Sequence, residues 1–130
     1  MSKTNNPVTF FELPADNMER ISTFYQSVFG WKTPEQGGGN LWAFTTETDD
    51  YGQSTQVGAV NGDFRRRGPG LEQPLIMITV DDVEAKLKVV EEAGGAVIHP
   101  AQDESAFGGP VWAVFADTEG NKLGIYSFKH

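Results

Sequence analysis

The sequence contains no cysteine, which excludes disulfide bonds and thiolate metal sites. Histidine is also scarce, with two residues, of which His130 is the last in the sequence. No apolar run approaches the roughly 20 residues that a membrane-spanning helix requires. The first residues contain no apolar segment of the kind that secretory signals carry. We therefore expect a cytoplasmic protein that does not enter a membrane.

Positive charge is in short supply, because 10 Lys and Arg face 18 Asp and Glu, for a net charge of -8. An acidic surface repels phosphate backbones, so we expect no nucleic-acid partner. The same charge favours solubility and would also suit a cationic small molecule. With 130 residues the chain is long enough to bury the core of one domain.

The chain contains an internal repeat. Residues 10–33 and 75–98 align without a gap at an offset of 65 residues (75 − 10). Each stretch begins with an apolar strand, continues with apolar residues at helical spacing, and ends at glycine. The helix starts are marked by Asp16-Asn17 and Asp81-Asp82, and the helix ends by Gly30 and Gly94-Gly95. This order of signals predicts the same strand–helix unit twice.

Short strands follow each predicted helix, near residues 31–34, 41–47 and 56–61 in the first half and near 96–99, 110–116 and 122–128 in the second. The fold class is therefore α+β, with two βαβββ modules that form a curved mixed sheet around a shared cleft. We expect a single domain, 1–130, with modules 7–62 and 74–128. The linker 63–73 contains Arg65-Arg66-Arg67, which we interpret as a solvated charge run and not as an anion site.

Four motifs carry a resemblance to a known family. They are Asp-Asn-x-Glu-Arg from Asp16, Phe-Tyr-x-x-Val-Phe-Gly-Trp at 24–31, VDDVEAKLKVVEEAGG at 80–95 and FADTEGNKLGIYS at 115–127. Together they resemble the vicinal oxygen chelate superfamily, which includes glyoxalase I, bleomycin-resistance proteins and extradiol dioxygenases. The chain is most similar to the single-domain branch related to lactoylglutathione lyase. The resemblance implies a glyoxalase/bleomycin-resistance/dioxygenase-like fold, a lyase-like activity and a homodimer.

The resemblance also implies where a metal would be bound. Metal-dependent members hold it with His and Glu from strands of both modules, and the matching positions here are Phe10, Leu75, Gly124 and one near Ala59. Phe, Leu and Gly side chains cannot bind a divalent cation. We therefore expect no metal and no other cofactor, which argues against a metal-dependent lyase or dioxygenase.

Strand alternation predicts which residues line the cleft. If Phe11 and Leu13 pack on the helix, then Phe10 and Glu12 face the cleft. The same rule, applied to both halves, adds apolar and small residues to the wall and Thr79 and Lys122 as polar groups. The predicted ligand-binding residues are Phe10, Trp42, Phe44, Leu75, Met77, Phe107, Trp112 and Gly124.

Two polar residues are candidate catalytic groups. Glu12 among aromatic residues would have a raised pKa and would suit a general base. The alternative, which is the commoner one, is that Glu12 bonds to a backbone N–H, an arginine or solvent. Tyr126 can donate to an oxygen anion, although such a tyrosine is more often core packing with a solvated hydroxyl. His99 precedes Pro100 and is interpreted as a loop histidine.

Three functions compete on this evidence. The first is a metal-independent, enzyme-like protein that acts on a small organic molecule through Glu12 and Tyr126. The second is a binding protein that, like bleomycin-resistance proteins, sequesters a drug or metabolite without catalysis. The third is a structural partner with no ligand. The sequence favours the first and leaves its substrate open.

Overall fold

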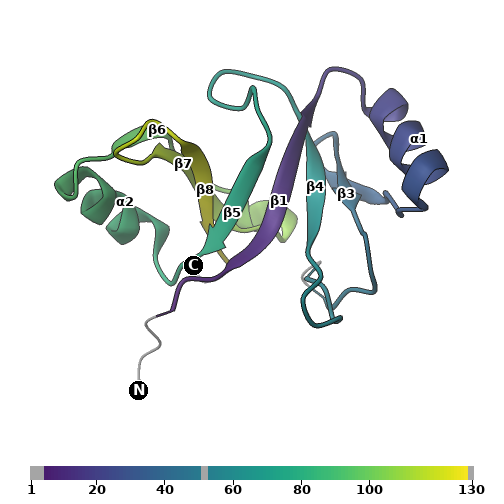
Figure 1. Cartoon of the computed structure of the whole chain (residues 1–130), viewed down its shortest axis with the longest axis horizontal. Coiled ribbons are helices and arrows are strands. Elements are labelled where there is room, and N and C mark those ends of the chain that lie inside the picture. The colour runs from purple at the N-terminus through teal and green to yellow at the C-terminus, as the bar shows by residue number, and fades with distance from the viewer. Residues whose placement is uncertain (1–4, 51–52, 129–130) are drawn as a thin grey trace. The chain divides into compact units, whose positions relative to one another are not determined.

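The computed structural model describes residues 5–50 and 53–128. The chain divides into two compact units, residues 9–75 and residues 5–8 with 76–128. Figure 1 labels most of the elements. In chain order the elements are β1 (Val8–Ala15), α1 (Met18–Phe29), β2 (Glu35–Gly37), β3 (Asn40–Ala43), β4 (Asn61–Arg66), β5 (Leu75–Thr79), α2 (Val83–Glu92), β6 (Ala96–Asp103), the 3-10 helix η1 (Ser105–Phe107), β7 (Val111–Ala116) and β8 (Lys122–Ser127).

The first unit orders its strands β2-β3-β4-β1. Strands β1 and β4 are parallel, and β3 is antiparallel to both β4 and β2. Helix α1 lies beside β3 and β4 (Figure 1). This is a β-α-β-β-β order in sequence, as the repeat predicts.

Helix α1 begins and ends for the reasons that the sequence supplies. The Asn17 side chain accepts a hydrogen bond of 2.9 Å from the Arg20 N–H, and Gly30 ends the helix in the left-handed region at φ 73°. Tyr25 packs on Trp31, and Trp31 packs in turn on Phe11. Phe11 therefore faces the helix side of the sheet, and the prediction that Phe10 and Glu12 lie on the opposite face is confirmed.

The last strand of this unit corrects two predictions. The predicted strand at 56–61 is wrong, because β4 is Asn61–Arg66 and occupies part of the stretch assigned to the linker 63–73. The cause is tertiary. Asn61 and Asp63 have low strand propensity, but both are buried, and Phe64 between β4 and α1 is 0% exposed. The predicted strand at 31–34 is reduced to a bridge between Lys32 and Phe44.

The prediction that Arg65-Arg66-Arg67 is a solvated charge run is wrong for Arg65. The Arg65 side chain is 11% exposed and forms an ion pair with Glu12. Arg66 is exposed, and Arg67 pairs with Asp16 at 3.1 Å. Strand alternation turns Arg65 to the polar face of β4, and it could not do so from a flexible linker.

The second unit orders its strands β5-β8-β7-β6, with β5 and β8 parallel and the other pairs antiparallel. Asp82 caps α2 through a bond of 3.0 Å from the Ala85 N–H. A core cluster forms between α2 and the sheet from Val80, Val83, Leu87, Ala113 and Ile125. Because Ile125 faces α2, its neighbours Gly124 and Tyr126 lie on the other face, as predicted.

Strand β6 corrects the interpretation of His99. The strand runs past Pro100 to Asp103, with irregular register on both sides of His99. Proline is tolerated because β6 is the last strand in the order of its unit. His99 is therefore a strand residue, and its ring stacks on Trp112 with centroids 4.5 Å apart.

Neither of the helices in the described part of the chain is long and apolar enough to cross a bilayer.

Candidate functional site

Two carboxyl groups meet on the first unit, on the sheet face opposite α1. Glu12 of β1 and Asp63 of β4 are direct partners in the parallel pairing of these strands. Glu12 is 5% exposed and Asp63 is 2% exposed. Buried carboxyl groups this close cannot both carry an unopposed charge, so their partners decide what each can do.

Glu12 has a cationic partner. The Arg65 Nε donates a hydrogen bond of 2.9 Å to Glu12 Oε2. Arg65 follows Asp63 by two residues on β4, so both side chains lie on the same face of the sheet. The ion pair gives the buried Glu12 carboxyl a charge-assisted hydrogen bond. An arginine partner is the alternative that the sequence left open for this residue.

Asp63 has the opposite environment. Burial, and then the charge of Glu12, raise the pKa of the Asp63 carboxyl well above its usual range. Arg65 and a hydrogen bond of 3.0 Å from Gln36 Nε2 to Asp63 Oδ2 oppose this rise in part. The carboxyl whose pKa is raised by burial is therefore Asp63.

Asn61 adds an oriented amide next to this pair. Its Oδ1 accepts hydrogen bonds from the Thr45 N–H at 2.6 Å, the Thr45 hydroxyl at 2.9 Å and the Thr46 N–H at 3.0 Å. Its Nδ2 is buried and has no hydrogen-bond partner among the described residues. One buried donor on this strand face is thus unpaired, beside the Asp63 carboxyl that Gln36 and Glu12 contact.

Aromatic rings flank the polar groups. Phe10, the β1 partner of Asn61, meets Trp42 edge-on with ring centroids 6.1 Å apart. Trp42 is paired with Asp63 across β3 and β4, and its ring lies 5.2 Å from that of Phe44. The first unit therefore brings Phe10, Glu12, Trp42 and Phe44 together, as the sequence predicted. Their contact with a ligand stays a prediction.

The other predicted site residues are placed as follows. Leu75 is buried, and Met77 pairs with Gly124, where an added Cβ would strike the Met77 Sδ. Tyr126 and Trp112 are buried partners across β8 and β7. Phe107 is 74% exposed in η1. No ligand role of these residues is tested by their positions.

Four residues of this face were not predicted from the sequence as site residues, namely Asp63, Arg65, Asn61 and Gln36. Three of them follow the alternation Asn61-x-Asp63-x-Arg65, which would have indicated one strand face if the segment had not been read as a linker. The ligand position expected near Ala59 is also wrong. The repeat matches Glu12 with Met77. Met77 pairs with Gly124, and Glu12 pairs with Asp63. The residue of the first unit that corresponds to Gly124 is therefore Asp63.

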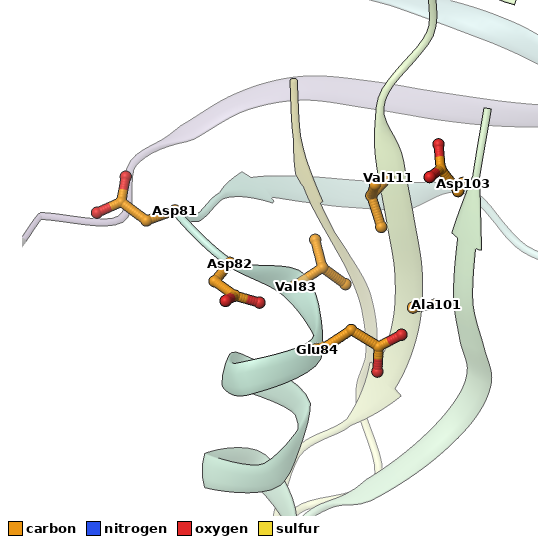
Figure 2. Close-up of a pocket in the computed structure, with 7 residues that line it drawn as sticks. All are labelled: Asp81, Asp82, Val83, Glu84, Ala101, Asp103 and Val111. Carbon is orange, nitrogen blue, oxygen red and sulfur yellow. The ribbon is translucent and has the colours of Figure 1, made fainter. Parts of the chain in front are cut away.

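An acidic pocket lies on the second unit, at the start of α2 (Figure 2). Asp82 caps the helix, so one of its carboxylate oxygens already has a structural role. The pocket is lined by Asp81, Asp82, Glu84 and Asp103 around Val83, Ala101 and Val111. The described residues contain no group of three His, Asp or Glu side chains arranged to hold a metal ion, here or elsewhere.

A sequence profile of the Glyoxalase/Bleomycin resistance protein/Dioxygenase superfamily matches residues 8–125. The chain belongs to this superfamily. A "Glyoxylase-like domain-containing protein" of Didymella fabae is 30% identical over 91% of this chain and 91% of its own length. The "Anthracycline biosynthesis protein DnrV" of Streptomyces peucetius is 29% identical over 90% of this chain, which spans 45% of that protein.

A solved structure shows the same fold. The Mn(II)-bound glyoxalase from Novosphingobium aromaticivorans superposes with a TM-score of 0.57 at 18% identity, over 95% of this chain and 38% of that one. The two βαβββ modules of the chain are thus the glyoxalase-type α+β fold that the sequence predicted.

The residues of this superfamily member do not fit the divalent metal that the fold implies. Phe10, Leu75 and Gly124 offer no donor atom, and the Met77 side chain occupies the space next to Gly124. At the position of Asp63 a carboxyl is present, but Glu12 and Gln36 already contact it. Two adjacent carboxyl groups, with no third His, Asp or Glu beside them among the described residues, do not make a metal site.

Proposed function

We propose that this superfamily member is a metal-independent protein that binds a small organic molecule and moves a proton on it. The reacting groups are Glu12 and Asp63. Glu12, paired with Arg65, takes up the proton, and Asp63, whose pKa is raised, is the group that donates one. Phe10 and Trp42 provide apolar contact for the ligand.

One observation carries the proposal, namely that two adjacent buried carboxyl groups have opposite environments. A purely structural ion pair would need Glu12 and Arg65 alone. Asp63 adds a second carboxyl whose burial is unfavourable and which shares a hydrogen bond with Glu12. Strongly perturbed carboxyl groups cluster at functional sites. The Streptomyces relative, named for anthracycline biosynthesis, supports an organic ligand.

The expected chemistry is removal and return of a proton on a carbon next to a carbonyl group. The Glu12 carboxylate takes the proton, and the C–H electron pair moves to the carbonyl oxygen to form an enolate. A proton delivered from Asp63, or returned by Glu12, re-forms the C–H bond. When Asp63 delivers it, Glu12 is left protonated and Asp63 ionised, and proton exchange with solvent restores both groups.

The test uses acetylacetone, a small uncharged dicarbonyl, in D₂O. We expect the wild-type protein to accelerate loss of its carbon-bound protons, followed by NMR, above the rate in buffer. Glu12→Gln should lose roughly 10²-fold or more of that acceleration. The matched control Glu91→Gln, an exposed change on α2, should keep it.

Binding without acceleration would favour the alternative, a protein that sequesters its ligand without catalysis. Saturation-transfer NMR on the same samples distinguishes the two results. Acceleration that Glu12→Gln leaves intact would remove Glu12 from the mechanism.

A further inference from the structure

Asn61 is held in one orientation by its surroundings. Three donors converge on its Oδ1, from the Thr45 N–H, the Thr45 hydroxyl and the Thr46 N–H. The amide cannot flip without losing the two bonds from the Thr45 and Thr46 N–H groups, because Nδ2 cannot accept a hydrogen bond. Its Nδ2 is therefore fixed on the opposite side of the amide.

This fixed N–H group is buried and unused. Asn61 is 0% exposed, and its Nδ2 has no acceptor among the described residues. Buried donors are nearly always paired, so an unused one calls for an explanation. A purely structural role, in which Asn61 holds residues 45 and 46 in place, requires only Oδ1. It does not explain why the Nδ2 donor is buried without an acceptor.

The donor lies on the same face as the reacting carboxyl groups. Asn61 and Asp63 are two residues apart on β4, which places their Cα atoms about 6.6 Å from each other. Phe10, the β1 partner of Asn61, is two residues from Glu12 on the same face. This spacing matches a ligand of a few atoms, which would have to displace the side chains that leave Asn61 0% exposed.

We infer that Asn61 Nδ2 binds the carbonyl oxygen of the ligand and stabilises the negative charge that forms there when a neighbouring C–H proton moves to Glu12. The inference deepens the proposed function and rests on it. An N–H group that is oriented before the reaction stabilises such an oxygen anion without rearrangement. In this protein the amide supplies the stabilisation that a metal ion would otherwise provide.

The same surroundings define the class of ligand. Arg65, the nearby cation, is already paired with Glu12 and gives a ligand carboxylate no counter-ion, and Asn61 Nδ2 requires an acceptor. The favoured ligand is an uncharged carbonyl compound with a hydrogen on the adjacent carbon. Acetylacetone meets this description, whereas acetoacetate, of similar size, carries a carboxylate.

The decisive variant is Asn61→Asp, which keeps an oxygen for Thr45 and Thr46 and replaces the donor by an acceptor. We expect it to lose about 10²- to 10³-fold of the acetylacetone exchange rate. The control Asn40→Asp makes the same change at the β2–β3 turn, where the Asn40 oxygen accepts from the Arg66 N–H, and should keep the rate. Wild-type protein should accelerate the exchange of acetylacetone and not that of acetoacetate.

A measurement on the wild-type protein is independent of whether Asn61→Asp folds. In ¹⁵N-labelled protein, acetylacetone should shift one of the two Asn61 side-chain N–H signals. If those signals do not move, the amide binds water or nothing, and the inference is overturned.

The two proposals fail in different ways. Exchange that survives Asn61→Asp but not Glu12→Gln overturns the role of Asn61 and keeps the proposed function. An Asn61 signal that shifts without any exchange keeps the donor and overturns proton transfer. If acetylacetone causes no shift of the Asn61 signals and its exchange is not accelerated, both proposals are overturned.

Discussion

Asp63 is a buried carboxyl group whose protonation state should be visible in the stability of the protein. Because its pKa is raised in the folded chain, the native state keeps a proton that the unfolded state has already lost at the same pH. The free energy of unfolding should therefore fall as pH rises from the usual carboxyl range to the folded pKa, and then level off. The slope contributed by Asp63 is at most about 1.4 kcal/mol per pH unit.

Asp63→Asn should remove this contribution. The asparagine amide has no proton to lose, and its oxygen can still accept from Gln36. We expect the variant to gain stability relative to wild type as pH rises, measured by urea unfolding across about pH 4 to 8. Parallel curves for the two proteins would mean that Asp63 is ionised throughout.

Arg65 should be more important to stability than its place in a charged run suggests. Arg65→Met leaves the Glu12 carboxylate buried without its cation, which costs about 3–5 kcal/mol when one partner of a buried pair is removed. The double variant Glu12→Gln with Arg65→Met removes both charges and should recover most of the loss. Urea unfolding measures all of these variants.

The exposed neighbour on the same strand provides the control. Arg66→Met should change the free energy of unfolding by no more than about 0.5 kcal/mol. Equal losses in the free energy of unfolding for the variants at positions 65 and 66 would mean that the Glu12 ion pair does not stabilise the fold.

At the scale of elements, a glycine in the last strand of each half lies against a side chain of the neighbouring parallel strand, with different consequences. A Cβ at Gly62 would strike the backbone oxygen and the ring of Phe11, neither of which can move without distorting β1. A Cβ at Gly124 would strike only the Sδ and Cε of Met77, the end of a flexible side chain.

The two alanine variants should therefore differ. We expect Gly62→Ala to lower the free energy of unfolding by about 3 kcal/mol or more and Gly124→Ala to lower it by about 1 kcal/mol. The smaller loss is expected because overpacking is tolerated where a side chain can rotate away. Thermal and urea unfolding provide the comparison. A larger loss for Gly124→Ala would mean that Met77 is rigidly held.

The elements also show where sequence patterns are sufficient. Both helices were predictable, because their caps Asn17 and Asp82 and the glycine that ends α1 act within a few residues of chain. Strand β4 was not predictable from composition, because all of its residues except Phe64 are polar, glycine or charged. Only pairing with β1 and β3 gives Asn61 and Asp63 a reason to be in a strand.

At the scale of the whole molecule, the superfamily raises the question of a metal. We expect that neither a chelator nor Mn²⁺, Zn²⁺ or Ni²⁺ changes the melting temperature by more than about 1 °C, because a ligand raises it only when it binds the native state. Elemental analysis of the purified protein is the companion measurement. A stoichiometric metal with a clear stabilisation would restore a metal-dependent function.

The homodimer implied by the resemblance stays a prediction that analytical sedimentation can test.

The sequence by itself determined the fold class, the doubled module, the two helices and the face of β1 that carries Phe10 and Glu12. Each of these depends on local signals, such as caps, glycine stops and side-chain alternation, that repeat at an offset of 65 residues. Only the tertiary structure decided the partners of Glu12. Arg65 lies 53 residues away in sequence, and no local pattern encodes the strand register that brings it, Asp63 and Asn61 to the same face as Glu12.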